Sequence, residues 1–284
     1  MSPRSILAAA AIWLAACTGN APAPSATAQP RADLISLSPA ITETVALLGA
    51  GDRLAGRSDW CTEPAAVRAL PSFGTSLTPA LERLAAAAPA RILMDGSLAN
   101  QREQLAAIAP VEALPWLTVA EVVASTRRLG DLVGHPTEAA ALAARFEVWL
   151  RPVPAGARAA LLLIGDDGAE TGTFWFVKDD SLHGAMLRAA GWRNAVREAV
   201  TTPSLSAEGL LRRDPEAIVL LVPKALSADE QQQRIAAFSK FAGLRAVRGN
   251  RIAVVADPNI LSTGPSLLSS AERLATALKS LEAP

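Results

Sequence analysis

The chain has 284 residues, of which 50% are hydrophobic and 19% are charged, a composition that supplies a sizeable core and excludes a disordered chain. Lysine plus arginine and aspartate plus glutamate both number 27, so the formal net charge of zero argues against nucleic-acid binding and against a polybasic membrane surface. One four-ligand zinc site would consume both cysteines and both histidines, and tyrosine is absent. We therefore expect no resident metal and no cofactor.

The N-terminal segment has the pattern of an export signal. Arg4 precedes an apolar run over 6–16 that is too short to span a membrane and has the length of a signal-peptide core. The run leads to Cys17 in the string Leu-Ala-Ala-Cys, which resembles a bacterial lipobox, in which the cysteine is lipidated and becomes the first residue. Cleavage after Ala28, at an A-x-A site, is the alternative.

The lipobox interpretation divides the N-terminal segment into a lipoprotein signal peptide at 1–16 and a proline-containing tether at 17–32. The protein is then exported, to the periplasm or the cell envelope, and its only membrane contact is the lipid anchor. If Cys17 carries lipid, Cys61 is a lone thiol. If Cys17 is not processed, a disulfide between Cys17 and Cys61 is the alternative.

Beyond residue 33, short apolar runs alternate with segments of helical periodicity. Strands are expected at 33–37, 53–56, 90–94, 111–114, 159–164, 217–222 and 251–255. Helices are expected at 39–48, 79–88, 101–108, 181–190, 206–213, 228–238 and 264–281. This alternation predicts parallel sheets covered by helices, which is an α/β fold.

About thirty residues in the middle of the chain, from 119 to 150, carry no strand signal. They are rich in Ala, Leu, Glu and Arg and are broken only at Gly134-His135-Pro136, so we expect two helices, the second of them long. The layout is therefore an N-terminal lobe at 33–118, a helical connector at 119–152 and a C-terminal lobe at 153–284.

One motif occurs in both lobes. The pattern E-x-L-x-x-x-x-P-x-x-I begins at Glu82 in the first lobe and at Glu208 in the second, and each copy runs from a predicted helix into a predicted strand. A general helix-to-strand turn can produce the same pattern. Agreement at four positions favours two related lobes.

Motifs for catalysis are missing from the sequence. There is no phosphate-binding loop and no nucleophile elbow, and the glycines at 49–56 follow a helix, so they indicate a helix stop. His135 and His183 each lie beside a predicted helix start, where a capping or surface role is the simplest interpretation, and the acidic stretch 166–170 lacks the alternation of a calcium loop. We do not expect an enzyme.

Several strings carry a family resemblance, in a consistent order and spacing from 33 to 281. They are ISLSPAITETVALLGAGDRLAGRSDWC, LGDLVG, LSAEGLLRRDPEAIVLL and GPSLLSSAERLATAL. This order resembles the cluster-A solute-binding proteins of ABC importers for cobalamin, haem and iron–siderophores, and within that family the cobalamin binders most closely. The resemblance implies two Rossmann-like lobes joined by one long helix, a ligand cleft between the lobes, and delivery of the ligand to a permease dimer by a protein that we expect to be a monomer.

The resemblance also implies a set of ligand-binding residues, most of them at the carboxyl ends of predicted strands, where open α/β sheets bind ligands. They are Ser38, Asp59, Trp60, Asp95, Gly96, Phe174, Trp175 and Asp257. Trp60 matches an aromatic residue that packs on the corrin ring. Because Phe174, Trp175 and Phe176 cannot all face one way, at least one of them is expected in the core. Where cobalamin binders have tryptophan, this chain has Ser76, Asp95 and Thr202.

The chemistry of the available side chains ranks the ligands. Haem capture favours Tyr or His, and the chain has no Tyr. An anionic ferric siderophore favours an arginine cluster, and Arg57 is the one candidate near the N-lobe site. A corrinoid therefore ranks first, and a ferric siderophore or other metal chelate second. A lipoprotein enzyme or scaffold on the same fold stays as an alternative. The resemblance further implies that Glu82 and Glu208 each dock to one permease subunit.

Overall fold

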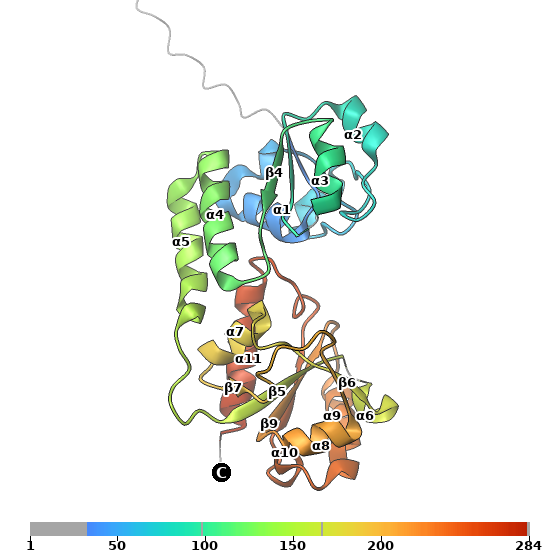
Figure 1. Cartoon of the computed structure of the whole chain (residues 1–284), viewed down its shortest axis with the longest axis vertical. Helices are drawn as coiled ribbons and strands as arrows, with labels where there is room; N and C mark the ends of the chain where they lie inside the picture. Colours follow the sequence, from blue (N-terminus) through green and yellow to red (C-terminus); the bar gives the residue numbers. More distant parts are fainter. Residues whose placement is uncertain (1–32, 98, 166, 283–284) are drawn as a thin grey trace, which may run out of the picture. The chain divides into compact units, whose positions relative to one another are not determined.

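The structure is a computed structural model that describes residues 33–97, 99–165 and 167–282 (Figure 1). The predicted signal peptide, the tether and the lipid attachment at Cys17 therefore lie outside the described residues. The described chain contains two four-stranded parallel sheets, each covered by helices, so the predicted α/β fold with two lobes is confirmed.

The first sheet has the strand order β2-β1-β3-β4. Its strands are β1 (Leu34–Ser36), β2 (Leu54–Arg57), β3 (Arg91–Asp95) and β4 (Val111–Leu114). Its helices are α1 (Pro39–Val45), α2 (Leu81–Ala87) and α3 (Ala99–Ala106). All three residues of β1 are buried, as expected for the strand of a parallel sheet that is covered on both faces. The chain leaves α1 through Gly49, whose φ of 86° ends the helix as predicted.

The second sheet has the order β10-β9-β5-β7. Its strands are β5 (Ala159–Ile164), β7 (Arg193–Asn194), β9 (Ala217–Val222) and β10 (Ile252–Ala256). The helices around it are α6 (Gly168–Thr171), α7 (Leu182–Ala189), α8 (Ala207–Arg213), α9 (Ala228–Ala236), α10 (Arg245–Arg248) and α11 (Leu267–Ser280). Every residue of β9 is buried, which explains its unbroken run of apolar side chains.

The two sheets share one topology. When the parallel strands of each lobe are numbered along the chain, both sheets have the order 2-1-3-4. The repeated sequence motif falls at the same place in each lobe, since Leu84 and Leu210 are both fully buried. The residues just before the two motif prolines, Ala88 and Asp214, both adopt left-handed backbone, with φ of 44° and 39°. The repeat predicted from the sequence is therefore a repeat of structure.

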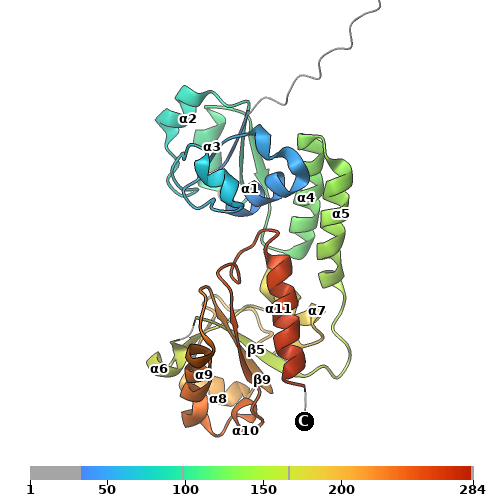
Figure 2. The same cartoon turned by 180° about the vertical axis from the view of Figure 1, so that it is seen from behind.

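Two helices connect the lobes, α4 (Val119–Val133) and α5 (Pro136–Glu147), followed by a 3-10 turn at Val148–Leu150. They lie side by side (Figures 1 and 2), and Gly130 of α4 lets them approach, because a Cβ there would collide with the Ala139 side chain. The two-helix prediction is confirmed. The second helix is nevertheless the shorter one, with 12 residues against 15, because its last turn tightens ahead of Pro152.

The sequence did not predict one small antiparallel pair, β6 (Thr173–Trp175) with β8 (Ser204–Ser206). Each strand has three residues, too few to establish a periodicity. The pair sets the orientation of Phe174 and Trp175 in β6. Among the described helices, none combines the length and the apolar character that crossing a membrane requires.

Candidate ligand-binding cleft

The two lobes meet at the loop that leads from β10 into α11. The indole Nε1 of Trp116 donates a hydrogen bond of 2.8 Å to the carbonyl oxygen of Thr263. Ser266 donates from its backbone nitrogen and from its hydroxyl, the latter at 3.2 Å, to the carboxylate of Glu43 on α1. Gly264 lies so close to Glu43 that a Cβ would collide with the carboxylate. These contacts hold the α11 loop against the N-terminal lobe.

A hollow of about 190 Å³ lies beside this junction. Residues from both lobes line it: Pro39, Glu43, Trp60, Thr62, Glu63, Pro258, Asn259, Ser262 and Ser266. Trp60 follows the carboxyl end of β2, and 48% of the residue is exposed. An exposed indole beyond a strand end can give a ligand a flat apolar wall, and the ligand contact at Trp60 stays a prediction that this position suits.

A second hollow of about 210 Å³ adjoins the first, because Pro39 lines both. Its other residues are Ser38, Ser76, Asp95, Ser97 and Thr263. Ser38 follows β1 and Asp95 ends β3, so neighbouring strands deliver their C-terminal residues to one place. Of the predicted ligand residues, Ser38, Trp60 and Asp95 are thus brought together. We refer to the two hollows jointly as the interlobe cleft.

Buried hydrogen bonds hold the Trp60 loop in place. Cys61 is a free, fully buried cysteine whose Sγ lies 3.1 Å from the Thr42 hydroxyl and 3.2 Å from the Ser58 hydroxyl. The Arg57 guanidinium donates to the carbonyl oxygen of Ser58 at 2.9 Å and to that of Arg68 at 3.2 Å. Arg57 therefore supports the loop through both amino nitrogens, while its buried Nε has no hydrogen-bond partner in the described structure.

The aromatic residues of β6 divide between core and surface. Phe174 is 1% exposed and packs in the core of the C-terminal lobe, with its ring centroid 5.6 Å from that of Phe241 and 5.9 Å from that of Phe238. Phe176 is also buried, whereas Trp175 between them is 49% exposed. Successive side chains of a strand point to opposite faces, so the predicted ligand contact at Phe174 is wrong, while Trp175 keeps an accessible ring.

Asp257 lies at the end of β10, as predicted, but its carboxylate is already occupied. It is 6% exposed and accepts hydrogen bonds from the Ser270 hydroxyl at 3.1 Å and from the Asn259 nitrogen at 2.9 Å. The Arg273 guanidinium lies 3.3 Å from the same carboxylate. The expected ligand contact is therefore corrected: Asp257 fixes the loop after β10 to α11, and the neighbouring Asn259 faces the cleft.

Two further predicted residues, Gly96 and Asp59, line neither hollow. A Cβ at Gly96 would come within 3.0 Å of the Pro115 nitrogen, so close backbone packing explains this glycine. Asp59 accepts a hydrogen bond from the Ser72 hydroxyl. The sequence analysis missed Glu43. The available signal was a carboxylate one helical turn beyond Pro39, on a helix that carries no other charged residue.

Burial shifts two titratable groups in this region. Desolvation raises the pKa of Glu43, and the nearby Glu63 carboxylate adds to the rise, while hydrogen bonds from Ser266 oppose it. Burial lowers the pKa of His183, whose Nε2 lies 2.7 Å from the carbonyl oxygen of Ile260. Burial thus favours the neutral form of His183, which contacts the backbone, and the other histidine, His135, precedes α5. No group of three or more His, Cys, Asp or Glu side chains suited to a metal ion occurs among the described residues.

The two predicted docking acids occupy equivalent places. Glu82 is the second residue of α2 and Glu208 the second residue of α8, and both are exposed. Glu208 forms an ion pair of 2.8 Å with Arg212, one turn further along α8. Favourable interaction with a helix N-terminus accounts for a carboxylate at either place, and exposure leaves both available to a partner.

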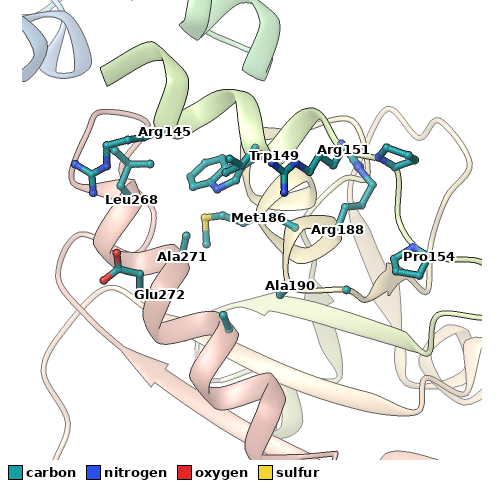
Figure 3. A pocket seen from close by; sticks show the side chains of 15 residues that line it. Arg145, Trp149, Arg151, Pro154, Met186, Arg188, Ala190, Leu268, Ala271 and Glu272 are labelled. Atoms are coloured by element: carbon teal, nitrogen blue, oxygen red, sulfur yellow. The ribbon is translucent and has the colours of Figure 1, made fainter. Parts of the chain in front are cut away.

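A larger hollow of about 600 Å³ lies away from the predicted site, among the end of α5, α7 and α11 (Figure 3). Trp149, Met186 and Leu268 contribute apolar surface to it, and Arg145 and Arg151 extend over it. Arg188, a third arginine there, is bound to the backbone and carboxylate of Asp179. No residue that the sequence singled out as a ligand contact lines this hollow.

Comparisons with known proteins place this geometry among binding proteins. The sequence matches the family of periplasmic binding proteins over residues 34–258. It is 29% identical over 194 residues to a vitamin B12-binding protein of Pectobacterium carotovorum, covering 66% of this chain and 70% of that one.

Solved structures show the same fold. A periplasmic haem-binding protein of Pseudomonas aeruginosa has a TM-score of 0.62 and 26% identity, covering 87% of this chain and 92% of that one. A periplasmic vitamin B12-binding protein of Vibrio cholerae has a TM-score of 0.68 and 18% identity, covering 90% and 99%. The cleft described above therefore belongs to a fold whose solved members include binders of different metal-containing macrocycles.

Proposed function

The chain belongs to the periplasmic binding protein family, and from that premise we propose that it captures a corrinoid in the interlobe cleft and delivers it to an ABC permease. The observation that carries the proposal is the exposed Trp60 ring on the wall of a hollow lined by both lobes. A corrinoid brings its own metal and metal ligands, so it requires from the protein a flat apolar wall and a few polar contacts.

The similarity to vitamin B12-binding proteins supports the choice of a corrinoid over haem. Haem is held through its iron, by His, Cys, Met or Tyr. This chain has no Tyr, His183 is bound to the Ile260 carbonyl, and His135 lies at the α4–α5 joint. Cys61 is buried and surrounded by hydroxyl groups. None of these side chains lines the interlobe cleft.

A ferric siderophore or another metal chelate is the second candidate. Anionic siderophores call for clustered arginines, and the backbone engages Arg57, the arginine nearest the Trp60 loop in sequence. The residues that line the cleft include Glu43, Glu63 and Asp95, whose charges oppose an anion. These observations support ranking the corrinoid ahead of a siderophore.

The proposed transport role includes two further features. The exposed acids Glu82 and Glu208 provide one charge on each lobe for a two-subunit permease, which suits electrostatic steering of the complex. A lipid at Cys17 would hold the protein, as a monomer, at the cell envelope near that permease. An enzyme or a scaffold on the same fold is the alternative to a transport role. The solved structures that resemble this chain are those of binding proteins, which favours transport.

A thermal-shift panel tests the proposal. The mature chain is melted alone and with cobalamin, cobinamide, haemin, a ferric trihydroxamate and a ferric tricatecholate, each at equal excess. A ligand at about 100 times its Kd adds about 2.7 kcal/mol to the free energy of unfolding and raises Tm by several degrees. We expect that rise with the corrinoids. A rise with haemin or a siderophore and none with either corrinoid would contradict the proposal.

A further inference from the structure

The charged side chains that line the interlobe cleft are all acidic. Glu43 and Glu63 line the first hollow and Asp95 lines the second, and no Lys, Arg or His appears among the described residues that line either one. The nearest compensating charge is Arg68, which forms an exposed ion pair of 2.8 Å with Glu63. The cleft therefore presents negative charge and hydrogen-bond acceptors to whatever enters it.

Two of these carboxylates, Glu63 and Asp95, each have an oxygen to spare, whereas both oxygens of Glu43 accept from Ser266. Glu63 uses Oε1 for Arg68, and Asp95 uses Oδ1 for the backbone nitrogen of Ser97 at 2.9 Å. The remaining oxygens can each accept a hydrogen bond from a ligand N–H or O–H. Around them the lining is neutral, with hydroxyl groups from serine and threonine and one amide, Asn259.

The charge of one carboxylate in the cleft, Glu63, already affects the pKa of another, Glu43. Glu43, whose carboxylate Ser266 holds across the lobe junction, has a pKa raised by burial and by the charge of Glu63. A ligand carboxylate placed in the same hollow would meet like charge. An amide N–H would instead match the free acceptors.

We propose that the interlobe cleft selects its ligand by charge, so that it accepts a macrocycle whose rim carries neutral amide donors and rejects the same macrocycle when that rim carries carboxylates. The inference rests on the proposed corrinoid function and specifies it further. Glu63 and Asp95 are the specificity-determining residues, since each lines the cleft and has one carboxylate oxygen for which the described structure shows no hydrogen bond.

A matched pair of ligands tests the proposal. Cyanocobalamin carries a rim of amides, and mild hydrolysis of one of them gives a monocarboxylate that differs by one negative charge. Affinities of the mature chain for both are measured by calorimetry at low and high ionic strength. We expect the monocarboxylate to bind about 10-fold more weakly at low salt, with the ratio shrinking as salt screens the repulsion.

The variant Glu63→Gln with Asp95→Asn keeps the shape of both side chains and removes both charges. We expect the affinity ratio to fall towards one in this double variant. A control variant, Asp131→Asn with Asp229→Asn, removes two exposed carboxylates that line neither hollow and should keep the wild-type ratio.

The outcomes separate the two claims. Equal affinities for the two ligands would overturn the charge selection and leave the corrinoid function standing. A ratio that stays the same in the Glu63→Gln, Asp95→Asn variant would also overturn it, because the discrimination would then come from elsewhere. Failure of the wild-type chain to bind either ligand would overturn the proposed function, and the charge selection with it.

Discussion

The Glu43 carboxylate on α1 receives both the backbone N–H and the hydroxyl of Ser266, a residue 223 positions away that precedes α11. The bond joins the two lobes at the edge of the interlobe cleft. The first N–H groups of a helix have no acceptor within the helix, and α11, with 14 residues, is the second-longest helix that the structure describes. Glu43 thus supplies from one lobe what the start of a helix in the other lobe requires.

Replacing Glu43 by alanine should weaken the lobe junction. The change leaves the Ser266 N–H without its acceptor in a half-buried place, so we expect the free energy of unfolding to fall by about 1–3 kcal/mol. Chemical denaturation measures this. Glu103→Ala, which removes an exposed carboxylate from α3, is the control and should change little. Equal stability of the Glu43→Ala and Glu103→Ala variants would contradict the role of the junction.

The same carboxylate should make stability depend on pH. Its folded-state pKa is raised above the ordinary value of 4.5, so folding favours the protonated form. The stabilising contribution of protonated Glu43 is therefore complete below pH 4.5 and is lost as the pH rises through the folded-state pKa. We expect the wild type to lose stability relative to Glu43→Gln as the pH rises over this interval. The difference between their denaturation midpoints measures this loss. A difference that is constant with pH, or that moves the other way, contradicts the assignment.

Buried strands made most of the fold predictable from the sequence. A strand of a parallel sheet that is covered on both faces must be apolar throughout, and β5 and β9 appear as unbroken apolar runs of six residues. Helix ends were equally clear at Gly49 and Gly134, because both require positive φ. The strands β6 and β8 were missed because their pairing joins segments about thirty residues apart, and no short-range pattern records such a contact.

The cleft was predictable only in part. The family resemblance indicated Trp60, Asp95 and Asp257. Asp95 ends β3, Asp257 directly follows β10, and Trp60 lies three residues beyond the end of β2. Whether a strand-end side chain faces a ligand depends on partners that are distant in sequence, as Ser270 and Arg273 on α11 demonstrate for Asp257. The Glu43–Ser266 contact also joins residues that are far apart in the sequence. The spacing of residues along the chain therefore could not show that either one lies at the lobe junction.

Reversing the charge of both docking acids should block transport. We expect Glu82→Arg with Glu208→Arg to abolish ligand uptake in cells that carry the cognate permease, while the purified protein keeps its ligand affinity. Asp131→Arg with Glu103→Arg changes the net charge equally at other exposed positions and should leave uptake normal. Normal uptake by the Glu82, Glu208 variant would contradict the docking role.

Lipidation should depend on one cysteine. Metabolic labelling with a palmitate analogue should mark the wild type and Cys61→Ser equally and should leave Cys17→Ser unmarked. Cys61 makes a suitable control because it is fully buried against Thr42 and Ser58. A mature N-terminus at Gln29 would show that the segment is cleaved as an ordinary signal peptide. Labelling of Cys17→Ser would show that the lipid is attached elsewhere, and either result would contradict the prediction.

The most direct test of the corrinoid cleft is equilibrium dialysis of cobalamin against the wild type and Trp60→Ala. The indole is half exposed, so its removal should leave Tm nearly unchanged. By contrast, Trp192→Ala, at a site 1% exposed, should lower Tm strongly. We expect the wild type to bind one cobalamin per chain and Trp60→Ala to bind it about 5- to 150-fold more weakly, the equivalent of about 1–3 kcal/mol. Equal cobalamin affinity of the two folded proteins would contradict a ligand site at Trp60.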